Sequence, residues 1–183
     1  MKLGDSRPCS TMPSGEKPSG DVGPARFREV MGHFATGVTV VTGIDPSGPA
    51  GFTCQAFAPL SLDPPLVAVA PAKTSMSWPR IASVGVFCVN VLSEAQEELC
   101  RRFAVSGGDK FMGVRWCHTP KGAPLIEGAL AWAECALVTV HDAGDHELVI
   151  GRVLGLGTGD GGGGGAGVIR PLLFYRGRFG LGG

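Results

Sequence analysis

The sequence predicts a mainly β domain with helical additions (α+β), and three observations point to this class. Several short runs rich in β-branched and aromatic residues recur at short spacing along the chain. Glycine and proline, with 30 and 14 residues, separate these runs as turn residues do. Only two or three segments have helical periodicity, so strands outnumber helices. With 183 residues, of which 44% are hydrophobic, the chain can build one domain with a real core.

The N-terminal part of the chain predicts a tail followed by a helix and a strand. Residues 1–23 are rich in proline, glycine, serine and charge, which is typical of a disordered tail, so the domain is expected over 24–183. Apolar residues then recur with the i, i+3, i+4, i+7 spacing of an amphipathic helix, at Phe27, Val30, Met31 and Phe34. Gly37 is expected to end this helix, and the β-branched run 38–42 predicts the first strand.

The next segment predicts two strands, a loop and a short helix. Strands are expected near 51–57 and 66–70, with a turn over 45–49 before them. Between them lies a loop of small and hydroxyl residues, which the Asp63-Pro64-Pro65 run ends. Residues 77–82 predict a short helix, capped by Ser75 or Ser77.

The second half of the chain alternates strands with one longer helix. A strand is expected over 86–92, and Ser93 with Gln96 forms a capping box that opens a helix through Phe103. A mixed connection over 105–127 leads to the last predicted strands, near 129–140, 146–156 and 171–178. The glycine run 157–167 predicts a flexible loop. It contains the spacing GxGxxG at Gly157, Gly159 and Gly162, but no helix follows to form a dinucleotide fingerprint.

Charge and hydropathy exclude several classes of protein. Sixteen basic and sixteen acidic residues give a formal net charge of +0, without the basic stripe of a nucleic-acid binder. No apolar run is long enough to cross a bilayer, and the N-terminus lacks the apolar core of a secretory signal. We therefore expect a cytoplasmic protein with no nucleic-acid partner and no membrane attachment.

The cysteines and histidines do not indicate a metal centre. The six cysteines lack CxxC spacing, and Cys88 and Cys135 lie in apolar runs where they are expected as small buried residues. Cys54 lies in the candidate ligand loop, without a basic neighbour to activate its thiol. His141, Asp142, Asp145 and His146 straddle a glycine turn without a third histidine or a cysteine to complete a site, so no metal is expected.

The run from Lys73 to Ser77 offers a cation and three hydroxyls between a strand and a helix, which would suit a phosphate group. The alternative is ordinary helix capping beside a solvated lysine.

Five segments together resemble one known family, in the same order along the chain. GFTCQAFAPLSLDPPL at 51–66 resembles the signature of the flavin reductase family. FREVMGHFATGVTVVT at 27–42, FCVNVLSEAQEELCRRFA at 87–104 and PLLFYRGRFG at 171–180 are similar to other segments of that family. Gly144-Asp145-His146 looks like its GDH motif. The resemblance covers roughly residues 25 to 180. The chain departs from the family at 54–56, where Cys-Gln-Ala replaces residues that are often small serines.

The resemblance implies a split β-barrel that reduces free flavin with a reduced nicotinamide cofactor. It leaves open FAD or FMN as the flavin, and NADH or NADPH as the reductant. It places the nicotinamide against Gly144, Asp145, His146 and Tyr175, with Phe179 as an alternative to Tyr175 for stacking. In this reading His146 orients the nicotinamide, and no side chain acts as a nucleophile or acid–base catalyst. The implied flavin contacts are Thr36, Gly37, Val38, Thr53, Cys54, Gln55, Ala56, Ser61, Lys73, Ser75, Ser77, Val89 and Asn90.

The resemblance also implies partners. Members of the family are typically homodimers, and commonly pass reduced flavin by diffusion to a flavin-dependent monooxygenase or halogenase. Two other functions stay open on the residues. One is a direct flavin-dependent oxidase of the pyridoxamine phosphate oxidase type, in which the GDH run would have no role. The other is a non-catalytic flavin-binding module, which would not consume nicotinamide cofactor.

Overall fold

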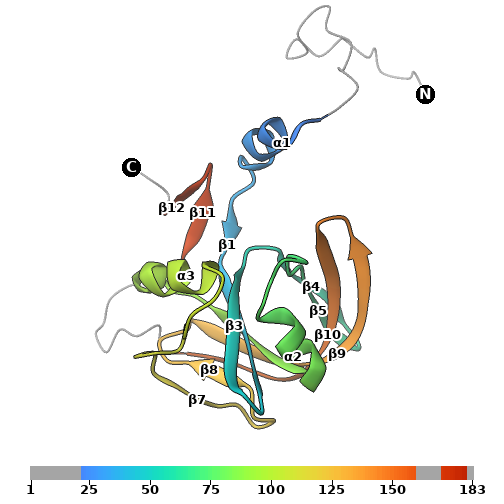
Figure 1. Ribbon diagram of the computed structural model, residues 1–183, viewed down its shortest axis with the longest axis vertical. Coiled ribbons are helices and arrows are strands. Elements are labelled where there is room, and N and C mark those ends of the chain that lie inside the picture. The colour runs from blue at the N-terminus through green and yellow to red at the C-terminus, as the bar shows by residue number, and fades with distance from the viewer. Residues whose placement is uncertain (1–21, 160–169, 181–183) are drawn as a thin grey trace, which may run out of the picture.

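The computed structural model describes residues 22–159 and 170–180, and most of these lie in or around one antiparallel sheet (Figure 1). The sheet has seven strands in the order β3-β2-β6-β9-β10-β5-β4. Their bounds are β2 (Thr39–Asp45), β3 (Gly48–Cys54), β4 (Phe57–Leu62), β5 (Pro65–Val69), β6 (Val86–Val91), β9 (Ala131–Ala143) and β10 (His146–Thr158). The expected mainly β class with helical additions is confirmed. The predicted tail 1–23 and the centre of the glycine run lie outside the described residues, apart from 22 and 23.

The sheet curls around a single apolar cluster, as a split barrel does. Phe52 on β3 and Val69 on β5 belong to the same cluster, although four strands separate them in the sheet order. Phe87 on β6 and Cys135 on β9 complete its wall, and both are almost fully buried. Side chains of alternate residues point to opposite faces of a strand, so the inner face of the curled sheet forms one core.

Two helices pack on this sheet and close it. Helix α2 (Trp78–Val84) inserts Trp78 and Ile81 into the inner core. Helix α3 (Glu97–Ala104) follows a 3-10 turn, η1 (Glu94–Gln96), and buries Cys100 and Phe103 in a second cluster. A Cβ on Gly51 would lie 2.6 Å from Phe103 Cε1, so α3 packs directly on the backbone of β3. This contact brings the end of α3 next to the end of β3.

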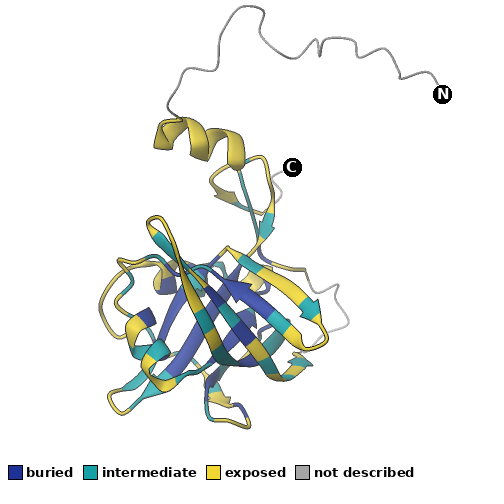
Figure 2. Cartoon of the chain, turned by 90° about the vertical axis from the view of Figure 1, so that its right-hand side faces the viewer, coloured by how far each residue is buried: buried dark blue, intermediate teal, exposed yellow. Residues whose placement is uncertain are grey.

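Three smaller units complete the fold. Strands β7 (Trp116–His118) and β8 (Pro124–Ile126) form a hairpin over the outer face of the sheet. Strand β1 (Thr36–Gly37) pairs with β11 (Leu173–Tyr175), which pairs with β12 (Arg178–Phe179). Helix α1 (Pro24–Met31) stands away from the body of the molecule, and none of its residues is buried (Figure 2).

The structure corrects four predicted elements. The loop expected after residue 57 is largely the strand β4, whose edge position tolerates Pro59 because an edge strand can lack one N–H donor. The strand expected over 171–178 is divided into β11 and β12 by a turn in which Arg176 and Gly177 have positive φ. The mixed connection 105–127 contains the β7–β8 hairpin.

The fourth correction concerns the first helix, which ends at Met31 and not at Gly37. Gly37 lies instead in β1, because the backbone at Thr36 and Gly37 pairs with β11. Phe34 therefore lies beyond the helix and is exposed. Among the described residues, no helix combines the length and apolar character needed to cross a bilayer.

Candidate flavin and nicotinamide site

A cavity of about 480 Å³ lies where β3 ends, between α3, the segment after β5 and the β11–β12 turn. Its walls are mainly apolar, with a few hydroxyls, one histidine and one lysine. This combination suits a planar, partly polar ligand. The lining residues are Val38, Phe52, Thr53, Cys54, Gln55, Ala56, Ala70, Ala72, Thr74, Ser75, Met76, Cys100, Phe103, Ala104, Ser106, Gly107, Lys110, His146, Phe174 and Phe179.

The end of β3 supplies backbone donors to this cavity. Gln55 and Ala56 lie in the gap between β3 and β4, and their N–H groups have no acceptor among the described residues. Thr53 directs its hydroxyl to the carbonyl oxygen of Cys100 at 2.6 Å, which ties β3 to α3. The backbone at the cavity wall is therefore held in place while two of its donors remain available to a ligand.

Cys54 forms part of the cavity wall, and its thiol is not activated as a nucleophile. Its side chain is buried, and burial raises the pKa of its thiol. Its Sγ lies 3.5 Å from the carbonyl oxygen of Ala56, as a weak donor. The thiol thus stays protonated at neutral pH, as expected from the absence of a basic neighbour.

The segment after β5 and the β9–β10 hairpin form the opposite wall. A bridge pairs Ala72 with His146, and the N–H of Lys73 donates to the carbonyl oxygen of Asp145 at 3.0 Å. His146 lines the cavity, and its Nδ1 lies 2.8 Å from Asp145 Oδ1. This hydrogen bond lowers the pKa of Asp145, which fixes a carboxylate beside the imidazole. Gly144 has φ of 76° at the hairpin turn, a conformation that favours glycine.

Lys73 does not line the cavity. Its ammonium forms an ion pair with Asp142, which draws the side chain toward the hairpin. Ser75 and Thr74 do line the cavity, and Ser75 Oγ also accepts the N–H of Trp78 at 3.2 Å, the cap expected for this helix. Two of the three hydroxyls of the predicted phosphate segment, those of Thr74 and Ser75, therefore lie at the cavity, whereas its cation is already paired.

The C-terminal segment closes the cavity with aromatic rings. Phe174 and Phe179 line it, with ring centroids 5.0 Å apart, and the guanidinium of Arg101 lies 4.7 Å from the centre of the Phe179 ring. Tyr175 is not among the lining residues, and its ring packs edge-on against His33. Of the two aromatic residues expected for stacking, Phe179 is therefore the one at the cavity.

The β1 segment places one more candidate near this region. Val38 lines the cavity. Thr36 Oγ1 is buried and has no hydrogen-bond partner within 22–159 and 170–180, so a polar ligand atom could satisfy it. Gly37 pairs with Leu173 and does not line the cavity.

Four residues implied by the resemblance lie elsewhere. Val89 is fully buried in the core of the curled sheet, and Asn90 is fully buried in a hydrogen-bond network among β2, β6 and β8. Ser61 lies on the edge strand β4, away from the cavity lining. Ser77 lines a neighbouring cavity.

The last residue of α3 and the loop 105–110 are a part of the site that sequence reasoning missed. Ala104, Ser106, Gly107 and Lys110 line the cavity beside the end of α3. The signal was weak, because the loop falls in a segment without periodicity. Its Gly-Gly pair, with positive φ at Gly107 and Gly108, was the only local indication of a special backbone. Among the described residues, no group of three or more histidine, cysteine or acidic side chains could hold a metal ion.

Comparison with known proteins identifies relatives over nearly the whole described chain. A sequence model described as the flavin reductase like domain matches residues 31–182. The reductase subunit HsaB of a flavin-dependent monooxygenase from Rhodococcus jostii is 49% identical over 158 residues, which cover 86% of this chain and 77% of that protein.

Two solved structures agree with this match. Nitrilotriacetate monooxygenase component B from Mycobacterium thermoresistibile has 46% sequence identity and a TM-score of 0.79, with 85% of this chain and 84% of that chain covered. The NADH:FAD oxidoreductase SgcE6 of Streptomyces globisporus, in complex with NAD and FAD fragments, has 36% identity and a TM-score of 0.77. That alignment covers 87% of this chain and 92% of SgcE6.

Proposed function

The chain belongs to the flavin reductase-like family of oxidoreductases, and from this premise we propose that it transfers a hydride from NADH to a free flavin. The observation that carries the proposal is the cavity at the end of β3. It combines apolar walls with two backbone N–H groups, of Gln55 and Ala56, that have no acceptor among the described residues. Two similarities support NADH and a flavin as the substrates. The flavin reductase like domain matches all of the segments that form the cavity, and the NADH:FAD oxidoreductase SgcE6 is among the structural relatives.

The residues of the cavity fit a flavin and provide positioning and electrostatic stabilisation. A bound flavin supplies the chemistry, because its ring accepts the hydride of a reduced nicotinamide. The N–H groups of Gln55 and Ala56, which have no acceptor among the described residues, would be donors for the negative charge that develops on a flavin ring, and preorganised donors stabilise such charge without reorganisation. The apolar walls, with Val38, Phe103 and Phe174, would exclude water from rings bound in the cavity. No step requires a protein nucleophile.

We infer that the reduced flavin passes to a separate flavin-dependent oxygenase. Three kinds of relative carry such a role in their names. HsaB is the reductase subunit of a monooxygenase, BorF is the flavin reductase component of a tryptophan halogenase, and a styrene monooxygenase has its own flavin reductase. Each of these names distinguishes the reductase from the oxygenase or halogenase with which it works. A monooxygenase is therefore the recipient that these similarities favour for this chain.

The test of the function is turnover. Purified protein with NADH or NADPH should lose reduced-nicotinamide absorbance only when FMN or FAD is added, because the flavin is the acceptor. The cavity variant Ala56→Pro, which removes one of the two free N–H groups, should lower the maximal rate. Quenching of flavin fluorescence without NADH consumption would instead identify a non-catalytic flavin-binding module.

Replacing His146 with alanine should impair use of the nicotinamide more than use of the flavin. The imidazole lines the cavity at the β9–β10 hairpin, where Asp145 orients it. We expect His146→Ala to raise the KM for NADH about tenfold, the effect of losing one hydrogen bond to a polar ligand group. The KM for flavin should change less than about twofold. Steady-state kinetics with each substrate varied in turn measure both constants, and equal effects on the two would contradict the assigned role.

We propose that the protein is a homodimer, and helix α1 supports this. The helix stands away from the body with no buried residue (Figure 2). It nevertheless carries exposed apolar side chains at Phe27, Val30 and Met31. Exposed apolar residues on one side of an unsupported helix are typical of an interface. Light scattering at micromolar concentration should give twice the chain mass of 18.8 kDa. Met31→Glu should shift the species toward monomer, whereas Arg26→Gln on the same helix should not. A monomeric wild-type protein would refute the proposal.

A further inference from the structure

The end of the β9–β10 hairpin, which carries His146, extends beyond the strands that flank it (Figure 1). Strand β5 pairs with residues 149–152 of β10, and β6 pairs with residues 131–136 of β9. The hairpin tip, residues 141–147, therefore has no strand beside it within the described chain, and residues 141–145 are all exposed. Projecting segments with few buried contacts are among the parts of a protein that open most readily. His146 thus needs a support other than the sheet to stay at the cavity.

Backbone contacts attach the hairpin tip to the segment between β5 and α2. The N–H of Glu147 donates to the carbonyl oxygen of Pro71 at 3.0 Å, and the N–H of Lys73 donates to that of Asp145 at 3.0 Å. The bridge between Ala72 and His146 lies between these two bonds. All three contacts join the tip to a loop. They therefore hold the tip only as firmly as the loop itself is held.

One side-chain contact joins the hairpin tip to the core. The indole Nε1 of Trp78 donates to Glu147 Oε2 at 2.6 Å. Trp78 is 4% exposed, and its ring packs edge-on against Phe52 and Phe87, with centroids 6.2 and 6.3 Å away. Within 22–159 and 170–180, no cation forms an ion pair with Glu147, so the indole is the partner of its carboxylate. A charged acceptor makes such a bond stronger than one between neutral groups.

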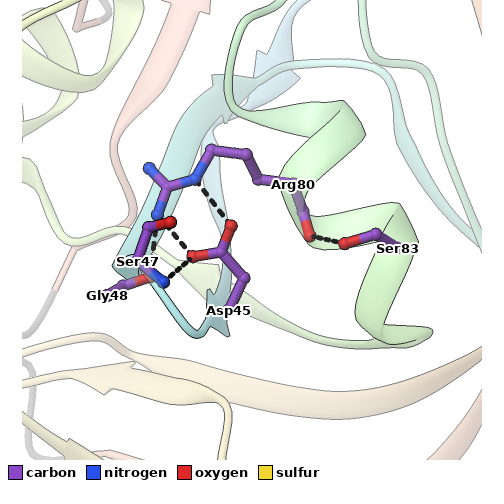
Figure 3. Close-up of polar contacts among 5 residues, drawn as sticks. All are labelled: Asp45, Ser47, Gly48, Arg80 and Ser83. Atoms are coloured by element: carbon purple, nitrogen blue, oxygen red, sulfur yellow. Dashed lines mark hydrogen bonds and ion pairs between the residues drawn. The ribbon is translucent and has the colours of Figure 1, made fainter.

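Helix α2 holds Trp78 in a fixed position relative to the sheet. Arg80, one turn along the helix surface, donates to Asp45 at the end of β2 through Nε at 2.9 Å and Nη2 at 2.7 Å (Figure 3). Its Nη2 also donates to the carbonyl oxygen of Gly48 at 2.9 Å. On the opposite side of the helix, Ile81 is buried in the same core as Trp78. The indole is therefore a rigid anchor for the mobile end of the hairpin.

The contact with Trp78 also decides which face of the strand carries the imidazole. Glu147 directly follows His146, and successive side chains of a strand point to opposite faces. While Glu147 is held toward Trp78, His146 lies on the other face, where it lines the cavity. A shift of one residue in the pairing would exchange the two side chains and turn the imidazole away from the cavity.

We propose that Trp78 and Glu147 are positioning residues for NADH. Their hydrogen bond keeps the hairpin tip docked on the segment between β5 and α2, and so keeps His146 at the cavity. The apparent affinity for the nicotinamide then scales with the fraction of molecules in which the tip is docked. The inference rests on the proposed function, and adds to it two residues that do not line the cavity themselves.

Variants that break this one bond test the proposal. Glu147→Leu removes the acceptor, and Trp78→Phe removes the donor but keeps an aromatic ring beside Phe52 and Phe87. We expect each to raise the KM for NADH about fivefold, while kcat and the KM for flavin change less than about twofold, because saturating NADH restores the docked tip. Glu147→Gln keeps an acceptor oxygen and should remain close to wild type. This comparison of leucine with glutamine stands even if Trp78→Phe proves unstable. A glutamine variant as impaired as the leucine variant would overturn the proposal.

Hydrogen exchange of the protein without ligands measures docking directly. The amides of Lys73 and Glu147, which bond between the tip and the loop, should exchange faster in Glu147→Leu and Trp78→Phe than in wild type. Trp132→Phe, at the opposite end of the hairpin, is the matched control and should leave both amides and the KM for NADH unchanged. A raised KM in Glu147→Leu with unchanged exchange of both amides would overturn the positioning role.

A double variant tests whether the pair acts through His146. Glu147→Leu should raise the KM for NADH in the wild-type background and have no further effect in the His146→Ala background. The same fold-change in both backgrounds would overturn the proposal. If His146→Ala raises the KM for NADH and Glu147→Leu does not, positioning by this pair is wrong and the proposed function stands. Absence of turnover by the wild-type protein with any flavin would instead refute the function itself.

Discussion

Asn90→Leu should lower the free energy of unfolding by about 3 kcal/mol, because it removes hydrogen bonds from a site without access to water. Asn90 is fully buried. Its Nδ2 donates to the carbonyl oxygen of Val40 and to Thr42 Oγ1, both at 3.1 Å, and its Oδ1 accepts the N–H of Ile126 at 2.8 Å. The side chain thus joins β2, β6 and β8. Leucine fills a similar volume but leaves the buried N–H of Ile126 without an acceptor.

Thermal unfolding measures this effect, with an expected fall in Tm of about 6–12 °C for a chain of this size. Thr158→Val, a polar-to-apolar change at an exposed position of β10, is the matched control and should leave the Tm nearly unchanged. Flavin affinity, measured well below the Tm, should be the same for Asn90→Leu and wild type, since Asn90 does not line the cavity. A large loss of flavin affinity with an unchanged Tm would restore Asn90 to the flavin site and contradict its structural role.

The sequence predicted the elements whose patterns are local. The β-branched runs around Val40 and Val89 are strands, and the capping residues Ser93 and Gln96 do precede a helix. The buried positions of Cys88 and Cys135 followed from the apolar runs around them. These features depend on neighbouring residues alone. They can therefore be read without knowledge of the tertiary structure.

The elements that were mispredicted depend on partners that are distant in the chain. Phe57–Leu62 has small residues, a hydroxyl and Pro59, and it becomes strand β4 because it pairs with β5 at a sheet edge. Thr36 and Gly37 look like a helix end, but β11 from the far end of the chain pairs with them. Periodicity correctly predicted a helix around Val30. It did not predict that the apolar side chains of this helix are not buried against any other part of the described chain.

The residues of the candidate site also differ in whether they could be predicted from local sequence or depend on partners that are distant in the chain. Residues 53–56 and His146 lie at the cavity, where the ordered motifs of the chain placed them. Lys73 and Lys110 could not be distinguished from sequence, because what separates them is their partners. Asp142 pairs with Lys73 across two segments, whereas in the part of the chain that the structure describes Lys110 meets only carbonyl oxygens of β3 and α3. Asn90 looked like a polar ligand for the ring, since a buried polar network is not visible until the strands are assembled.

Glu134→Ala should destabilise the fold by about 3 kcal/mol, chiefly at the β7–β8 hairpin. Glu134 is 1% exposed on β9, under the turn between β7 and β8. Its carboxylate accepts the hydroxyl of Thr119 and the backbone N–H of Lys121, at 2.9 Å to Oε1 and 3.1 Å to Oε2. Alanine removes all of these acceptors and leaves a cavity beneath Thr119, which is itself buried.

Glu134→Gln is the conservative comparison, because it keeps the volume and one acceptor oxygen, and it should cost less than half as much. Thermal unfolding ranks the two variants against wild type. Hydrogen exchange separates a local role from general destabilisation. Relative to wild type, Glu134→Ala should increase the exchange rate of the amides of residues 116–126 more than that of the amides of β5 and β10.

The β7–β8 hairpin that Glu134 anchors also carries Ile126, whose N–H donates to Asn90. The two variants should therefore interact, and the double variant should lose less stability than the sum of the single losses. Additive losses would show that the carboxylate and the amide stabilise the outer face of the sheet independently.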